Sequence, residues 1–167
     1  MNASADRPDI PVLIGLGSNI EPEKNIQAAL DLLGKHTKIV KQSSIWQTPA
    51  VGSSGPDYLN AAALVKTSLP LENLKSDLLA GIESSLGRIR SADKYMDRTI
   101  DLDVLIYNNI EVDPELWSQA HIAVPASELC PDFINTETGE ELSSAAARLS
   151  KGRNLRKRRS LPRSSRS

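Results

Sequence analysis

The stretch that most constrains the fold is Arg98–Tyr107, with the sequence RTIDLDVLIY. Its apolar residues recur at every second position, which predicts a β-strand with one face in the core. Asp101 and Asp103 then project together from the other face, with Cα atoms roughly 6–7 Å apart, twice the rise per residue. Two ionised carboxylates this close repel each other unless a cation lies between them. Because Mg²⁺ takes carboxylate oxygens together with substrate phosphates, the strand predicts a magnesium site; the alternative is the solvated face of an edge strand.

Arginines precede this strand in a polar segment. Arg88, Arg90 and Arg98 lie within eleven residues of one another. The guanidinium fork matches phosphate oxygens in geometry and charge. An acid pair next to an arginine cluster indicates metal-assisted phosphoryl chemistry.

Composition narrows the class of protein. With 167 residues, 40% hydrophobic and 25% charged, the chain predicts one globular domain. No apolar run is long enough to span a membrane, and no signal-peptide pattern is seen. The single cysteine, Cys130, excludes an internal disulfide and a multi-cysteine zinc site. We therefore expect a cytoplasmic protein without a membrane partner, and we expect a monomer.

Charge is unevenly distributed along the chain. Residues 151–167 hold eight basic and no acidic residues, which leaves residues 1–150 with a net charge of −9. We predict a single domain over residues 1–150 and a disordered basic tail over 151–167. The tail is either a solubilising or self-associating extension or a patch that binds RNA by counterion release.

The order of predicted elements indicates an α+β fold. Strands are expected at 11–16, 37–46, 58–65, 100–107, 110–112 and 120–124, and helices at 22–33, 70–86 and 140–149, with one further helical turn at 125–129. Short connections, including an Asn108-Asn109 turn, favour a mostly antiparallel, ferredoxin-like sheet with helices on one face. The other face would carry the ligand residues.

Two further features invite functional interpretations. The Gly15–Gly17 turn is compatible with a dinucleotide-binding loop, but it lacks the third glycine and the downstream acid of that motif. Thr48–Asp57 is a loop of small residues, either a connector or a lid over a ligand. Asn60 offers a donor and an acceptor suited to the amide-like edge of a heterocycle, or it closes the preceding loop by a hydrogen bond.

Four segments together resemble one enzyme family. They are Gly15–Asn19 with the Asn25-Ile26 and Ala29-Leu30 pairs; Ser44–Pro49 with Pro56–Ala62; Ile82-Glu83 with Leu86–Arg90; and Arg98–Leu105. Over roughly Val12–Asp132 the chain resembles 6-hydroxymethyl-7,8-dihydropterin pyrophosphokinases (HPPK) of the folate pathway. The resemblance implies Mg²⁺-dependent transfer of pyrophosphate from ATP to the hydroxymethyl oxygen of the pterin, leaving AMP.

The resemblance also implies roles for individual residues. Two Mg²⁺ ions would be held by Asp101 and Asp103, and Arg88 and Arg98 would act as catalytic groups on the phosphates. The implied nucleotide side consists of Glu83, Arg90, Arg98 and the backbone around Val104. The implied pterin side consists of Thr48, Pro49, Val51, Tyr58, Asn60, Tyr95 and His121.

The chain departs from the family pattern after Val112. The segment Asp113–Gln119 is short and lacks the histidine and arginine that the family uses on the nucleotide side. His121 falls where a phenylalanine usually stacks on the pterin, so it either stacks there, replaces the missing histidine, or is a structural residue without a functional role. Two alternatives to the pyrophosphokinase follow: a ferredoxin-like module that binds RNA through its sheet and tail, although the chain has few aromatic residues, and a paralogue deficient in nucleotide binding.

Overall fold

The structure is a computed structural model that describes residues 9–49, 57–87 and 100–158. A seven-stranded sheet runs through this part of the chain, and all its strand pairs are antiparallel. The spatial order is β6-β5-β1-β4-β3-β7, and β2 also pairs with β4. The strands are β1 Ile10–Ser18, β2 Lys38–Gln42, β3 Ile45–Thr48, β4 Tyr58–Thr67, β5 Asp101–Tyr107, β6 Ile110–Glu111 and β7 Arg156–Arg158.

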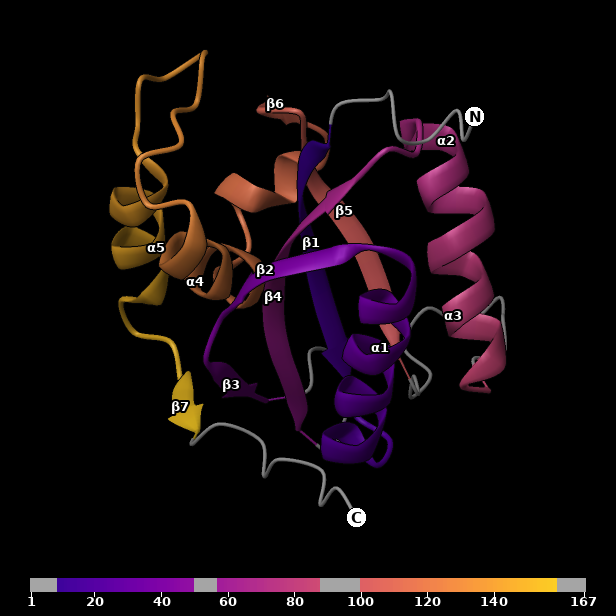
Figure 1. The fold of residues 1–167 in the computed structure, drawn as a ribbon. Coiled ribbons are helices and arrows are strands. Elements are labelled where there is room, and N and C mark those ends of the chain that lie inside the picture. The colour runs from indigo at the N-terminus through magenta and orange to yellow at the C-terminus, as the bar shows by residue number, and fades with distance from the viewer. Residues whose placement is uncertain (1–8, 50–56, 88–99, 159–167) are drawn as a thin grey trace.

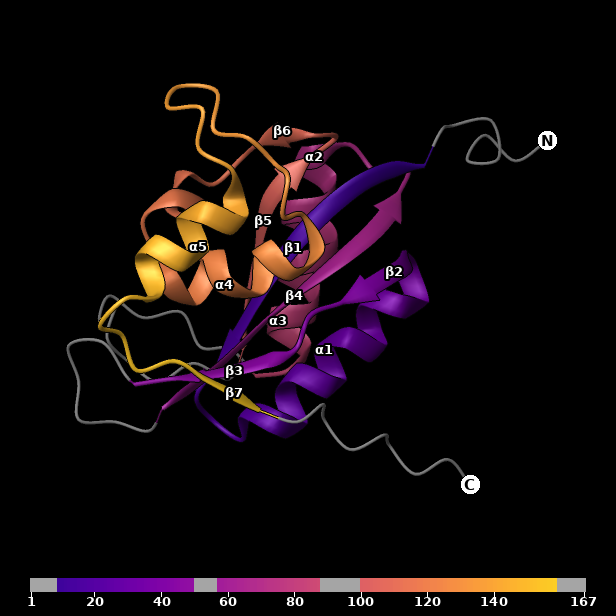
Figure 2. The ribbon, with the colours of Figure 1, turned by 90° about the vertical axis from the view of Figure 1, so that its left-hand side faces the viewer.

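Helices cover both faces of the sheet (Figure 1). One face packs against α1 Pro22–His36 and against a continuous helical segment formed by α2 Leu71–Asn73, the π-helical η2 Leu74–Leu79 and α3 Ala80–Ser85. The other face packs against the 3₁₀-helix η3 Pro114–Trp117, α4 Ala120–Leu129 and α5 Leu142–Ser150. Figure 2 shows α4 and α5 in front of the sheet. The α+β, ferredoxin-like prediction with a mostly antiparallel sheet is confirmed, but the prediction of helices on one face is wrong, because η3, α4 and α5 bury apolar residues against the face expected to carry ligand residues.

The conformational preferences of single residues explain where α1 begins and ends and where the chain turns between β5 and β6. Pro22 begins α1, as predicted, because proline lacks the N–H that the first turn cannot satisfy. The helix passes through Gly34, where the sequence predicted its end, and Thr37 closes it by donating its N–H and its hydroxyl to the carbonyl of Leu33. Asn108 and Asn109 have φ values of 53° and 64°, so the predicted tight turn is confirmed.

The predicted strand at residues 120–124 is wrong, because these residues form the first half of α4. Ala120, Ala123 and Val124 are buried at helical spacing, against α5 and the sheet. Pro125 lies inside the helix and lacks the N–H that would reach the carbonyl of His121. Burial of the small-residue face outweighs that missing bond.

The prediction of a disordered tail is wrong for its first part. Arg156–Arg158 form β7, which pairs with Ile45–Gln47 of β3. Opposite charges reinforce this pairing: Lys157 Nζ lies 3.7 Å from Glu128 Oε2, and Arg158 Nη2 lies 3.1 Å from Glu23 Oε1. Backbone pairing with an open strand edge requires no apolar side chains, so the charged composition did not exclude it. Residues 159–167 lie outside the described residues.

Candidate functional site

The pairing register of β1 with β4 and β5 brings three of the predicted site residues to one face of the sheet. Asp101 and Asp103 on β5 lie opposite Gly17 and Gly15 on β1, and Gly17 lies opposite Asn60 on β4. Since cross-strand partners point to the same side of a sheet, both carboxylates and the Asn60 amide share the face on which α4 packs. Asp103 is exposed and Asp101 is half-buried. The prediction that the two acids project together is confirmed.

Gly17 separates the acid pair from Asn60 without placing a side chain between them. A Cβ at Gly17 would lie 3.1 Å from Asn60 Oδ1, closer than most carbon–oxygen contacts in proteins. The predicted turn at Gly15–Gly17 is wrong, because both glycines lie within β1. Alternating glycines inside an apolar strand are the signal that could have located this close approach.

Asn60 is held by a buried hydrogen bond. Its Nδ2 donates to Thr48 Oγ1 over 2.9 Å, and both side chains are at least nine-tenths buried. The bond joins β4 to the last residue of β3 and fixes the orientation of the amide on that face of the sheet. Tyr58 lies opposite Thr48 and is partly exposed, and Pro49 follows Thr48 at the surface. Four of the predicted pterin residues are thus neighbours at one end of the sheet.

Glu83 reaches the acid-bearing strand from the opposite layer. It lies on α3, is 6% exposed, and its Oε2 accepts a hydrogen bond of 2.8 Å from the backbone N–H of Leu102. Leu102 separates Asp101 from Asp103, so Glu83 fixes the backbone between the two acids. The side chain of Val104 is buried in the core against the same helical layer, and the predicted role of its backbone stays a prediction.

His121 comes from helix α4 and lies near Asp101. It lies in the first turn of α4 and is largely buried, which lowers the pKa of its imidazole, while the nearby negative charge of Asp101 acts in the opposite direction. His121 and Asp101 are twenty residues apart in the sequence, and the fold brings them close enough for their charges to interact. This placement is compatible with both roles inferred for His121.

The remaining predicted site residues, Val51, Arg88, Arg90, Tyr95 and Arg98, lie outside the described residues. Among the described residues, no group of three or more His, Cys, Asp or Glu side chains could hold a metal ion. The donor set of Asp101 and Asp103 nevertheless fits Mg²⁺, which is commonly bound by one or two carboxylates and completed by water and substrate phosphates.

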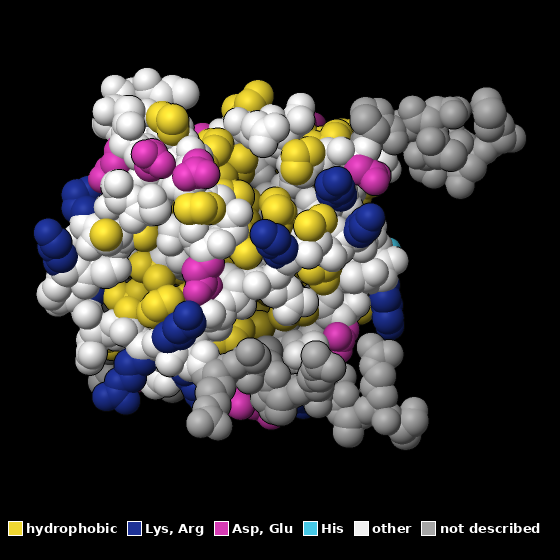
Figure 3. Space-filling model, turned by 60° about the vertical axis from the view of Figure 1, so that its left-hand side comes forward, with side chains coloured by type: hydrophobic (Ala, Val, Ile, Leu, Met, Phe, Trp, Pro, Cys, Tyr) yellow, Lys and Arg dark blue, Asp and Glu magenta, His cyan; other side chains and the backbone are white. Residues whose placement is uncertain are grey.

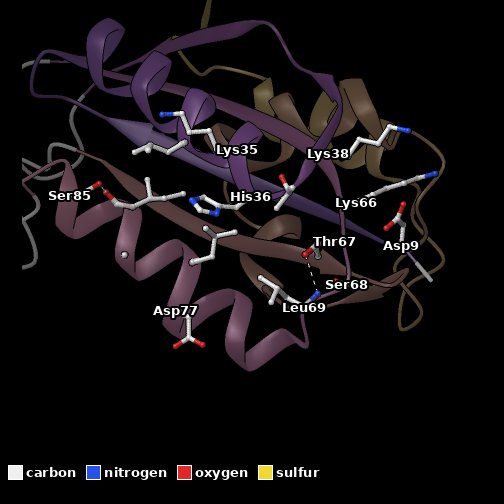
Figure 4. Close-up of a pocket in the computed structure, with 15 residues that line it drawn as sticks. Asp9, Lys35, His36, Lys38, Lys66, Thr67, Ser68, Leu69, Asp77 and Ser85 are labelled. Atoms are coloured by element: carbon white, nitrogen blue, oxygen red, sulfur yellow. Dashed lines mark hydrogen bonds between the residues drawn. The ribbon is translucent and has the colours of Figure 1, made fainter. Parts of the chain in front are cut away.

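A groove of about 860 Å³ lies elsewhere, between the end of α1, the end of β4 and the η2–α3 segment. Figure 4 shows Lys38 and Lys66 side by side at its rim and His36 directed between the helices. None of its lining residues is a predicted site residue, and it lies on the side of the sheet away from Asn60. We assign no substrate to this groove.

Comparison with known proteins agrees with this arrangement. An antiparallel sheet packed against helices in this way is an α+β fold of the ferredoxin-like type. The acid pair lies on β5, an inner strand of that sheet. Residues 13–131 match the family described as 7,8-dihydro-6-hydroxymethylpterin-pyrophosphokinase (HPPK). The chain belongs to this family.

Individual relatives give the same result. The chain is 35% identical over 149 residues to a 2-amino-4-hydroxy-6-hydroxymethyldihydropteridine pyrophosphokinase of Bacillus subtilis, covering 81% of this chain and 87% of the relative. It is 33% identical over 141 residues to the enzyme of the same name from Synechocystis, covering 78% and 71%.

Solved structures support the fold. The wild-type HPPK-DHPS of Plasmodium falciparum with SDX-DHP superposes with a TM-score of 0.70 at 10% identity. The match covers 89% of this chain and 46% of that longer chain, so this protein corresponds to less than half of the bifunctional one. At this identity the likeness concerns the fold alone.

Proposed function

We propose that this chain is an ATP:6-hydroxymethyl-7,8-dihydropterin pyrophosphokinase that acts in folate synthesis. The hydroxymethyl oxygen attacks the β-phosphorus of ATP, the bond from that phosphorus to the oxygen of the α-phosphate breaks, and AMP leaves. The hydroxyl proton is released, and the product is the pterin diphosphate. The observation that carries the proposal is the alignment of Asp101, Gly17 and Asn60 across three neighbouring strands.

The aligned residues Asp101, Gly17 and Asn60 have an acidic end and an amide end, and each end suits one substrate. Asp101 and Asp103 are the groups that would hold Mg²⁺ against the ATP phosphates, and we propose two ions at this pair. The chemistry that Mg²⁺ supplies when bound is neutralisation of charge on the transferring phosphates. Asn60, oriented by Thr48, presents an amide edge to the heterocycle.

Residues outside the described ranges complete the proposal. Arg88 and Arg98 would neutralise the charge that develops on the phosphates during transfer, since catalysis of phosphoryl transfer depends mainly on positioning and electrostatics. Arg90 would bind the nucleotide, and Val51 and Tyr95 would line the pterin pocket. We further propose that the enzyme is a cytoplasmic monomer. Within the described ranges, no helix combines the length and apolarity needed to cross a bilayer.

Product analysis tests the proposal. Purified protein with ATP, Mg²⁺ and hydroxymethyldihydropterin should form AMP and the pterin diphosphate, with no ADP. D101N and D103N should each lower the rate at least about a hundredfold, the scale on which loss of one electrostatic contact acts in a transition state. D77N removes an exposed acid on η2 and is the matched control. ADP formation, or full activity of both site variants, would contradict the proposal.

A nucleotide-binding-deficient paralogue remains the second candidate because of the short Asp113–Gln119 segment. Calorimetry with a non-hydrolysable ATP analogue and Mg²⁺ distinguishes the two, since only the active enzyme binds the analogue. The RNA-binding alternative is not favoured. Lys157 and Arg158 of the basic tail already pair with acids of the domain, and Figure 3 shows basic and acidic side chains interspersed on the face it displays.

A further inference from the structure

The C-terminal strand β7 lies against the strand that leads into the pterin end of the site. Ile45, Trp46 and Gln47 of β3 pair with β7 on one side, and Trp46 and Gln47 pair with β4 on the other. Within the described part of the chain, β7 therefore converts β3 from an edge strand into an inner one. The next residue of β3 is Thr48, which holds Asn60.

One carboxylate connects β7, β3 and α4. Glu128, in the last turn of α4, accepts a hydrogen bond of 2.7 Å at Oε1 from the backbone N–H of Ser44, the residue before β3. Its Oε2 lies 3.7 Å from Lys157 Nζ on β7. The same ammonium group lies 6.0 Å from the centre of the Trp46 ring, at the distance of a cation–π contact.

Helix α4 carries this connection across the site. It packs against β3, β4 and β1, with Glu128 at the β3 end and His121 close to Asp101 of β5 at the other. The seven-residue separation between Glu128 and His121 corresponds to about 10 Å of helix. Because both residues lie on α4, a displacement of its Glu128 end would also shift His121.

We propose that Glu128, together with Lys157, is a positioning residue for the pterin half of the active site. This inference rests on the proposed function. The hydrogen bond from Ser44 to the carboxylate is charge-assisted and short, whereas an exposed ion pair such as Glu128–Lys157 contributes little by itself. Glu128 should therefore matter more than Lys157, and an amide at position 128 should preserve most of the effect.

The experiment compares E128A, E128Q and K157M by steady-state kinetics. E128A should raise the KM for the pterin about three- to tenfold, the range expected when one net hydrogen bond is lost. E128Q should stay within about twofold of the wild type, because the amide oxygen still accepts from Ser44. The KM for ATP should change less than the KM for the pterin in every variant.

E140A is the matched control. Glu140 forms a surface ion pair with Arg148, with Arg148 Nε 2.9 Å from Glu140 Oε2, and Arg148 also donates to the backbone carbonyl of Trp117 in η3 rather than to β3. Equal rises of both KM values in E128A, or a rise in the pterin KM of E140A as large as that of E128A, would overturn the inference.

A second measurement needs no turnover. Hydrogen exchange of the backbone amides at 44–48 should be faster in E128A than in E128Q, because only the former loses the acceptor for Ser44. Unchanged exchange in E128A would also overturn the inference. Wild-type protein that forms no AMP refutes the proposed function instead, and the exchange result then still decides whether Glu128 anchors β3.

Discussion

The substitution Thr48→Val tests the pterin end of the site most directly. Thr48 Oγ1 accepts a 2.9 Å hydrogen bond from Asn60 Nδ2 in a buried position. Valine has nearly the same shape as threonine and cannot form this bond. The bond is lost in either orientation of the Asn60 amide, since a threonine hydroxyl can both donate and accept. The variant thus isolates one polar contact with little change in packing.

The expected cost follows from burial. A buried polar group left without its partner costs about 1–3 kcal/mol. For a chain of this size, each kcal/mol lowers the melting temperature by about 2–4 °C, so Thr48→Val should melt about 2–12 °C below the wild type. Thr48→Ser keeps the hydroxyl and removes one methyl group, which costs about 0.8 kcal/mol when that group is fully buried. The valine variant should therefore be the less stable of the two.

Activity gives the second part of the test. Once Asn60 is released from Thr48, its amide can rotate, so the KM for the pterin should rise more in Thr48→Val than in Thr48→Ser. Thermal unfolding followed by circular dichroism and a product assay for AMP provide the two measurements. The reasoning fails if the valine variant matches the serine variant in both melting temperature and pterin KM.

Three further predictions concern other groups of the molecule. Glu83→Ala should lower the free energy of unfolding in urea by about 1.5–3 kcal/mol, because a backbone N–H of β5 loses a charged acceptor, and Glu83→Gln by less. His121 should titrate by NMR with a pKa below 6.5, and Asp101→Asn should lower that pKa further by removing a favourable negative charge; His36→Gln assigns the signals. Burial raises the pKa of the Cys130 thiol, so iodoacetamide at pH 8 should modify it slowly until the protein is unfolded.

The lowered pKa of His121 also predicts how the free energy of unfolding changes with pH. Because burial lowers the pKa of His121 in the folded state, the unfolded chain binds a proton that the folded protein excludes. The free energy of unfolding should therefore be fully retained above about pH 6.5 and should decline as the pH falls toward the lowered pKa. A His121→Gln variant should lose part of this decline; an unchanged pH profile would contradict the burial of the imidazole.

Local rules explain why the core elements could be predicted. The alternation in Asp101–Tyr107, the proline at the start of α1 and the Asn108-Asn109 turn each depend on a few adjacent residues. The failures depend on distant partners. Residues 120–124 contain an apolar alternation at Ile122 and Val124, but the opposite layer offers a surface that fits small residues at helical spacing. The strand β7 exists because β3 presents an open edge, which nothing in residues 156–158 reveals.

The candidate site shows the same contrast. The types of its residues could be predicted from the sequence, but the register that brings them together could not. The sequence indicates that Asp101 and Asp103 share a face and that Asn60 is a polar group in an apolar strand. It does not indicate that Asn60 and Asp101 lie opposite the same residue, Gly17, because that depends on the pairing of β1 with both β4 and β5. A shift of one residue in either pairing would turn the amide or the acids into the opposite layer. Gly17 leaves the space between those two groups open, since a Cβ there would lie 3.1 Å from Asn60 Oδ1, whereas Gly15 packs against the side chain of Leu105. The D-x-D strand and the G-x-G strand therefore make physical sense as neighbours, but their pairing is a long-range contact that appears only in the structure.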